Sequence, residues 1–211
     1  MKIAYDFHIH SCLSPCGDKD MTPQNIGNMA KIMCYDAIAL TDHNTCGNCE
    51  ALIKVGKELG ITVIPGMELC TSEEVHVICL FPTLEKALEF SDFVYDTLPP
   101  VKNKPSVFGE QILMNECDEI TGTVERLLIT ASNISCAKVV SKVKEYGGIC
   151  YMWGDGSAIA CCPKSADAYP YDLRGIVQHE AGGHGFGKLA DEYIYHNAFI
   201  ETCGCNCCSH L

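Results

Sequence analysis

Residues 2–10, Lys2-Ile3-Ala4-Tyr5-Asp6-Phe7-His8-Ile9-His10, predict a β-strand that runs into a turn rich in Ser, Pro, Cys and Gly. Side chains alternate along a strand, so Asp6, His8 and His10 are expected on one face near its end. Two imidazoles and a carboxylate there suit a borderline divalent ion such as Zn²⁺, Mn²⁺ or Fe²⁺. A solvent-facing polar alternation explains His-x-His alone equally well, so the rest of the chain has to decide.

The composition of the chain indicates a globular protein and weighs against polyanions as partners. Its 211 residues can hold one large domain or two small ones. The formal net charge is −12 and there is no basic cluster, which argues against nucleic acid or an anionic membrane as partner. No apolar run reaches spanning length and no signal peptide is evident, so we expect a cytoplasmic protein. Nothing points to a particular oligomeric state.

The cysteines are distributed unevenly along the chain. Of the 16, ten lie within residues 1–150, where the lack of a signal peptide predicts reduced thiols. Six lie in the last 61 residues, as Cys161-Cys162 and the run Cys203-Gly-Cys205-Asn-Cys207-Cys208. Such a density is typical of secreted, disulfide-bonded segments, so the two parts of the chain indicate different compartments.

Predicted strands and helices alternate over the first 150 residues. Further strands are expected at 37–41, 62–65, 75–81 and from 149, and helices at 22–34, 49–59, 84–98 and 135–146. Residues 101–122 are expected to be irregular, with a helical pattern resuming at 123–131. This order predicts βαβ units around a parallel sheet, in which chemistry lies at the carboxyl ends of the strands. Further side chains of metal-ligand type occur there: Asp42, His43, Glu68 and His76.

These positions resemble the motifs of the PHP (polymerase and histidinol phosphatase) domain family. The matching stretches are Asp6-Phe-His8-Ile-His10, Leu40-Thr-Asp42-His43-Asn44, Pro65-Gly-Met-Glu68 and His76, and they hold all four histidines of residues 1–150. Members of this family are distorted seven-stranded β/α barrels that hydrolyse phosphoesters with two or three metals. The resemblance therefore implies an α/β, TIM-like barrel, a metal-activated water and a small phosphorylated substrate.

The resemblance also implies a role for each matching residue. His8 and His10 would bind one metal, Glu68 would bridge two, and His43 and His76 would hold the others. Asp42 would be a nearby catalytic carboxylate. Two simpler readings stay open, namely that Asp42 caps the following helix and that His76 is a core histidine.

The loop after His10 departs from the family pattern. The family often has Ser-Asp-Gly there, whereas this chain has Ser14-Pro15-Cys16-Gly17-Asp18, so the roles of Asp18 and of Asp6 stay open.

The family pattern ends after Tyr146-Gly-Gly-Ile149. There the family continues into a strand with a Pro-Ala-His type motif and, later, an Asp-x-His pair. Here Cys150–Ser157 reads Cys-Tyr-Met-Trp-Gly-Asp-Gly-Ser, and none of those motifs follows. We therefore expect a partial barrel, cut off after about five strands, with exposed edges and an incomplete metal shell.

The run from Gln178 to Tyr193 is close to the zincin helix motif, and the longer run from Asp172 to Phe199 resembles the IgA-peptidase-like (M64) zinc metallopeptidases. By that resemblance His179 and His184 would bind one zinc ion, Glu180 would be the general base, and Asp191, or failing that Glu192, would be the third ligand. On an ideal helix the two histidines are separated by roughly 140°, which a π-bulge between them would reduce. A glycine-rich turn with incidental histidines is the alternative.

The sequence thus predicts two units, residues 1–150 and a small helical, Cys-rich fragment 151–211. They meet without a linker, which favours a chimeric chain over a natural fusion of domains. The first functional hypothesis is a PHP-type phosphoesterase using Zn, Mn or Fe, impaired by truncation. The second is a zinc metallopeptidase, and the third is an inactive metal-binding chimera.

Overall fold

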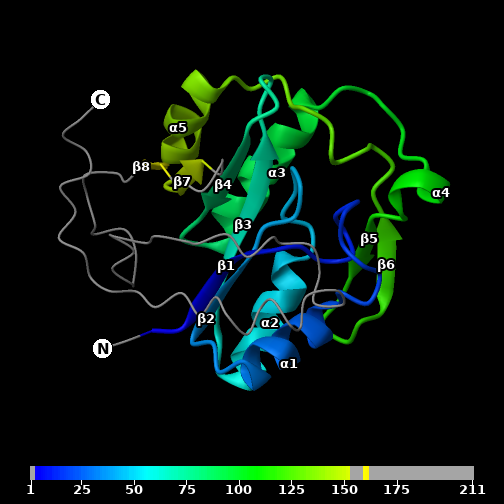
Figure 1. Cartoon of the computed structure of the whole chain (residues 1–211), viewed down its shortest axis with the longest axis vertical. Coiled ribbons are helices and arrows are strands. Elements are labelled where there is room, and N and C mark those ends of the chain that lie inside the picture. Colours follow the sequence, from blue (N-terminus) through cyan, green and yellow to red (C-terminus); the bar gives the residue numbers. More distant parts are fainter. Residues whose placement is uncertain (1–2, 153–158, 162–211) are drawn as a thin grey trace.

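A six-stranded mixed sheet organises the computed structural model, which describes residues 3–152 and 159–161 (Figure 1). The strand order is β1-β2-β3-β4-β7-β8. Their bounds are β1 Tyr5–Ile9, β2 Ala37–Leu40, β3 Thr62–Cys70, β4 His76–Leu80, β7 Ile149–Met152 and β8 Ile159–Cys161. Within the described part of the chain the sheet is open, with β1 and β8 at its edges. The predicted α/β class is confirmed, but these residues do not close a barrel.

The sheet changes from parallel to antiparallel within β3. Its first half, Thr62–Pro65, pairs in parallel with β2, and its second half, Gly66–Cys70, pairs antiparallel with β4. Strands β7 and β8 continue the antiparallel half. The prediction of a parallel sheet is therefore wrong beyond β3. Only five residues connect β3 to β4, and a parallel crossover needs a dozen or more.

The four longer helices follow the sequence-based bounds closely. They are α1 Pro23–Ile32, α2 Cys49–Leu59, α3 Leu84–Thr97 and α5 Cys136–Glu145. Thr22 and Thr83 cap α1 and α3 through side-chain hydrogen bonds, and α2 ends at Gly60 in the left-handed conformation. These end signals are local, which explains why the sequence predicts them well.

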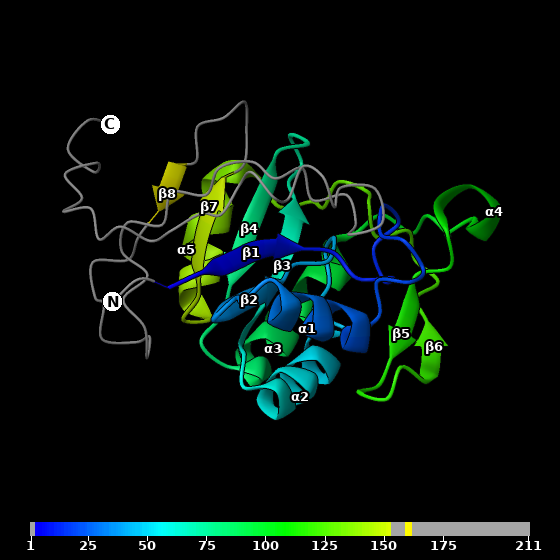
Figure 2. The same ribbon diagram turned by 60° about the horizontal axis from the view of Figure 1, so that its bottom comes forward.

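Two hydrophobic layers cover the sheet. Figure 2 shows α1, α2 and α3 beneath its strands, and Ile26, Leu52 and Phe90 from these helices belong with Leu69 of β3 to the larger layer. The second layer lies on the other face. It consists of Tyr5, Phe7, Ala39, Ile64, Ile78, Leu80, Ile149 and Tyr151. Alternate residues of β2, β3, β4 and β7 thus supply the two layers, as the pleat requires.

Residues 101–131 differ from the expected irregular stretch and helix. They contain the short helix α4, Pro105–Phe108, and a hairpin of β5, Ile112–Met114, with β6, Ile120–Thr123. Both lie at the opposite end of the molecule from β7 (Figures 1 and 2). The Gln111 side chain bonds backbone groups of Val124, Arg126 and Leu128. These groups are thereby satisfied without a helix over 123–131.

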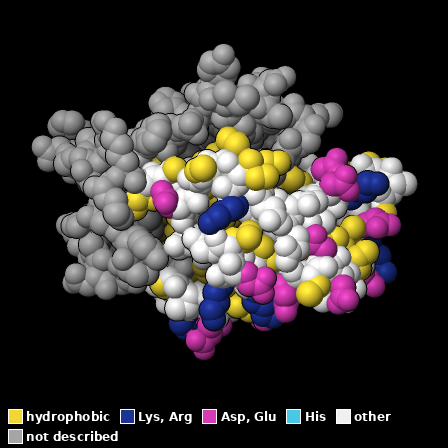
Figure 3. All heavy atoms as spheres, turned by 90° about the horizontal axis from the view of Figure 1, so that it is seen from below, with side chains coloured by type: hydrophobic (Ala, Val, Ile, Leu, Met, Phe, Trp, Pro, Cys, Tyr) yellow, Lys and Arg dark blue, Asp and Glu magenta, His cyan; other side chains and the backbone are white. Residues whose placement is uncertain are grey.

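Surface charges of both signs are interspersed on the face below α1 and α2. Figure 3 shows acidic and basic side chains alternating there with apolar ones, without a continuous basic stripe among the described residues. None of the described helices has both the length and the apolarity to cross a lipid bilayer.

Candidate metal centre

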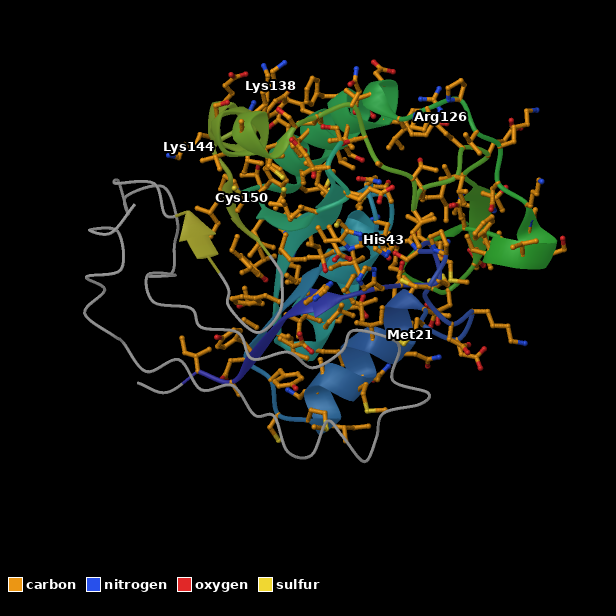
Figure 4. All side chains as sticks on the ribbon, turned by 45° about the horizontal axis from the view of Figure 1, so that its top comes forward. Met21, His43, Arg126, Lys138, Lys144 and Cys150 are labelled. Atoms are coloured by element: carbon orange, nitrogen blue, oxygen red, sulfur yellow. The ribbon has the colours of Figure 1, made fainter. Side chains whose placement is uncertain are left out.

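Four neighbouring strands, β1 to β4, deliver the histidines and Glu68 to one place, and His76 is the first residue of β4. His10 directly follows β1, His43 follows β2, and Glu68 lies in the second half of β3. The backbone fixes two of them: His43 and Glu68 form a parallel bridge, and the N–H of Glu68 donates to the carbonyl of Asp42 (3.1 Å). The N–H of Asn44 donates to the carbonyl of Glu68 (3.0 Å). His43 is buried near the middle of the described fold (Figure 4).

An irregularity in β1 decides which side chains face this centre. The pairing with β2 shifts between Asp6 and Ile9. Tyr5 and Phe7 pack in the layer away from the helices, whereas Ile9 packs in the layer between the sheet and the helices. The alternation therefore changes within the strand, as at a β-bulge, and His8 shares the face of His10 but not that of Asp6. The Asp6 carboxylate instead accepts a hydrogen bond from the backbone N–H of His8 (3.0 Å).

Four imidazoles surround the carboxylate of Glu68. Its Oε2 lies 3.3 Å from His8 Nε2, 3.0 Å from His10 Nε2 and 3.3 Å from His43 Nδ1. Its Oε1 lies 2.9 Å from His76 Nδ1. The Nε2 atoms of His8 and His10 are 3.1 Å apart. Glu68 is thus the common partner of every predicted histidine ligand in residues 1–150.

The pKa values in this cluster are strongly perturbed. Burial alone would raise the pKa of the Glu68 carboxyl, but hydrogen bonds from His10, His76 and His8 outweigh it and hold that pKa well below its usual range. Burial, reinforced by His10, lowers the pKa of His43 to about 3. Hydrogen bonds with Cys70 and Glu68 raise the pKa of His76 to about 10. His43 is therefore neutral at physiological pH, the form in which an imidazole binds metal.

Ser14 and Asp42 orient the imidazole of His10 through hydrogen bonds on its Nδ1 side, opposite the nitrogen that faces Glu68. Ser14 Oγ donates to Asp42 Oδ1 (2.7 Å) and accepts from the backbone N–H of His43 (3.0 Å). Because its single hydrogen goes to Asp42, its 3.0 Å contact with His10 Nδ1 requires the proton to be on that nitrogen. His10 Nε2 then presents its lone pair to the cluster, as in carboxylate-supported histidine ligands.

Asp42 is a buried supporting residue. Besides Ser14, its carboxylate accepts hydrogen bonds from the backbone N–H and the hydroxyl of Ser11, both at 2.7 Å. It does not cap α2, whose N-cap is Asn48. The helix-capping alternative is therefore wrong, and among the described residues the carboxylate is linked to the histidines through the hydroxyl of Ser14.

The donor atoms form three groups that fit divalent ions. They are His8–His10–Glu68, His43–Glu68–His76 and His10–Cys16–His43, and in each group one donor atom per residue lies within 4.8 Å of the others. Buried His43 Nδ1 makes no hydrogen bond with any described group despite its approach to Glu68, as expected of a lone pair that faces a cation. Imidazole with carboxylate suits Zn²⁺, Mn²⁺ and Fe²⁺.

Two of the remaining predicted residues lie outside the cluster, and the others fall outside the described part of the chain. Asp18 is exposed and accepts from the N–H of Asp20 (2.9 Å). Asp6 belongs to none of the three groups. The residues of the predicted zinc-peptidase motif are outside the described part of the chain; they are His179, Glu180, His184, Asp191 and Glu192.

Sequence reasoning missed two contributors in the loop after β1, Ser14 and Cys16. Both lie within the stretch 14–18 that departs from the expected Ser-Asp-Gly. The available signal was a cysteine, a competent metal ligand, in the same loop as His10. The burial of this loop against the cluster could not be read from the sequence.

The chain is similar to known proteins in sequence and in fold. A model of the PHP domain matches residues 6–147. The Uncharacterized protein MJ1587 of Methanocaldococcus jannaschii is 36% identical over 76 residues, which are 32% of this chain and 44% of that protein. This chain thus covers less than half the length of that relative.

Two solved structures resemble the described fold. A crystal structure from Bifidobacterium adolescentis, assigned as a metal-dependent phosphoesterase, matches with a TM-score of 0.50 at 15% identity over 72% of this chain and 67% of that one. The lesion-specific endonuclease PfuEndoQ of Pyrococcus furiosus matches with a TM-score of 0.48 at 18% identity, over 71% of this chain and 34% of its own. Because the first of these structures is only 15% identical in sequence, its similarity shows a shared fold alone.

Proposed function

Since this chain belongs to the PHP domain family, we propose that it is a metal-dependent phosphoesterase acting on a small phosphorylated substrate. The observation that carries the proposal is the convergence of His8, His10, His43 and His76 on the two oxygens of Glu68. Buried imidazoles around one shared carboxylate are a donor set for more than one divalent ion.

Each residue has a distinct part in this proposal. Glu68 can bridge two ions, because its Oε2 faces His8 while its Oε1 faces His76. Bound divalent ions supply acidified water and neutralise phosphate oxygens in an in-line displacement. Asp42, acting through Ser14, holds the proton on His10 Nδ1 and so positions this ligand.

The substrate is proposed to approach from the side of His76. Its side chain is 37% exposed, whereas those of His8, His10 and His43 are 7%, 4% and 5% exposed. A phosphate entering there meets the outermost histidine first. The −12 net charge of the chain opposes polyanionic substrates, which supports a small phosphoester.

The test is hydrolysis of p-nitrophenyl phosphate by the full chain loaded with Mn²⁺ or Zn²⁺, with bis-p-nitrophenyl phosphate to compare mono- and diesters. His8→Ala is expected to lower kcat/KM by about 100-fold or more, since removing even an outer-shell partner costs 10- to 100-fold. Asp18→Ala, an exposed carboxylate outside the cluster, serves as control. Activity that survives His8→Ala overturns the proposal.

A second proposed function is zinc-peptidase activity of the run from Gln178 to Tyr193. Its support is the sequence His179-Glu180-Ala-Gly-Gly-His184. Casein hydrolysis that disappears in Glu180→Ala would support it, and hydrolysis indifferent to that change would exclude it. Metal binding with neither activity would leave the third hypothesis, a metal-binding chimera.

A further inference from the structure

We infer that Cys16 is a thiolate ligand of a divalent ion that it shares with His43 and His10, which gives this centre a preference for Zn²⁺ over Mn²⁺. The inference rests on the proposed function in that it concerns the same cluster. It adds a soft ligand that the metal motifs of the sequence do not contain.

Geometry brings the three residues together from two separate loops. One donor atom of each of His10, Cys16 and His43 lies within 4.8 Å of the other two. Cys16 is partly buried, whereas both histidines are buried. Among the described groups, buried His43 Nδ1 has no hydrogen bond although it lies 3.3 Å from Glu68 Oε2, which is a second sign that a cation belongs here.

The loop that carries Cys16 is held rigidly against the end of β1. The N–H of Ser14 donates to the carbonyl of Ser11 (3.1 Å), and the N–H of Gly17 donates to that of Ser14 (2.9 Å). A Cβ on Gly17 would lie 2.1 Å from the carbonyl oxygen of Ser11, so only glycine fits. The position of Gly17 is thus fixed by backbone contacts, and these contacts hold the neighbouring Cys16 thiol near the histidines.

The ligand set determines which ion is favoured. Three protein ligands with two imidazoles and a thiolate match zinc centres that keep a position open for water or substrate. Thiolate ligands favour Zn²⁺, whereas carboxylate and water favour Mg²⁺ and Mn²⁺. Replacing the thiolate by a carboxylate should therefore shift the preference towards Mn²⁺.

The test is Co²⁺ titration of the metal-free, reduced full chain, followed by the thiolate-to-cobalt charge-transfer band. The band should appear in the native chain, disappear in Cys16→Ser and Cys16→Ala, and persist in Cys12→Ser. Cys12 is the matched control, because it is buried in the same loop and its Sγ faces the carbonyl of Ile112 (3.7 Å). Repeating the titration with serine at the six cysteines after residue 160 removes their contribution.

Zinc affinity provides the second readout. Cys16→Ser should weaken Zn²⁺ binding by about 100-fold, and Cys16→Asp should bind Mn²⁺ more tightly relative to Zn²⁺ than the native chain does. Unfolding midpoints of the metal-free variants show whether each one folds.

The inference is overturned if folded Cys16→Ser keeps both the band and its Zn²⁺ affinity. Phosphoesterase activity that then still depends on His8 would leave the proposed function intact. A native chain that binds neither Co²⁺ nor Zn²⁺ and hydrolyses no phosphoester would overturn both.

Discussion

Ser14 shows how much of the centre depends on one side chain outside the metal ligands. Its hydroxyl contacts Asp42, His10 Nδ1 and the backbone N–H of His43. In Ser14→Ala each of these three buried groups loses a hydrogen-bond partner, which should lower the free energy of unfolding by about 1–3 kcal/mol. Metal affinity should also fall by about 10- to 100-fold.

The measurements are urea unfolding of the metal-free chain and metal titration. Ser141→Ala is the control, because Ser141 is exposed and its hydroxyl bonds only the carbonyl of Lys138 among the described groups. Equal effects of the two substitutions would contradict the role of Ser14.

His43 gives the metal-free chain an acid-sensitive stability. Its pKa in the folded state is about 3 against an ordinary 6.5, so the unfolded chain binds a proton that the folded chain does not. This contribution is complete above pH 6.5 and is lost as pH falls towards 3. The lowered pKa of Glu68 acts in the same direction below its ordinary value of 4.5.

The check is urea unfolding with a chelator at several pH values in this window. His43→Asn cannot titrate, so its unfolding free energy should vary less steeply between pH 6.5 and 3. Identical slopes for the variant and the native chain would show that His43 is not the titrating group.

Among the elements, the loop 11–17 is the one whose backbone shape the centre most requires. In Gly17→Ala the new Cβ meets the Ser11 carbonyl at 2.1 Å, so the loop must shift. We expect a loss of about 1–3 kcal/mol in stability and a loss of metal affinity.

Gly122→Ala is the matched control for this substitution. Its added Cβ has Leu113 Cδ1 as its nearest neighbour at 3.8 Å, an ordinary contact. Thermal unfolding and metal titration of both variants compare the two sites. A Gly17→Ala chain as stable and as tightly metal-binding as Gly122→Ala would contradict the account.

Sequence patterns predicted the elements that local signals determine. Thr22-Pro23 and Gly60 mark helix ends by their own chemistry, and the apolar run 37–41 is a buried parallel strand. The parallel orientation of β4 was predicted wrongly, because the alternation of strands and helices hid a five-residue hairpin connection. The missing helix at 123–131 depends on Gln111, a distant side chain whose hydrogen bonds no window of sequence reveals.

The same distinction holds for the candidate site. His8, His10, His43, Glu68 and His76 could be proposed together, because polar ligand types at strand ends share one edge of a sheet. The separation of Asp6 from His8 depends on a bulge, which the alternation of residues 2–10 does not signal. The support of His10 by Ser14 and Asp42 depends on packing between two loops.

At the scale of the whole molecule, we propose that residues 1–150 and 151–211 act as separate units. The described metal cluster draws its ligands only from the first. If the units are independent, His8→Ala and His179→Ala should each lower the metal content per chain. The loss in the double variant should then equal the sum of the two single losses, as for distant sites. Metal content of the double variant that differs from this sum would indicate that the two units share a site.

The central claim is that Glu68 is the shared anchor of a metal centre, and metal content per chain tests it most directly. The full chain is purified with and without Glu68→Gln, dialysed, and analysed by inductively coupled plasma mass spectrometry, with His179→Ala as control for metal bound by the tail. We predict that Glu68→Gln loses divalent metal that the native chain and His179→Ala retain in residues 1–150. Equal metal content in Glu68→Gln and the native chain would contradict the account.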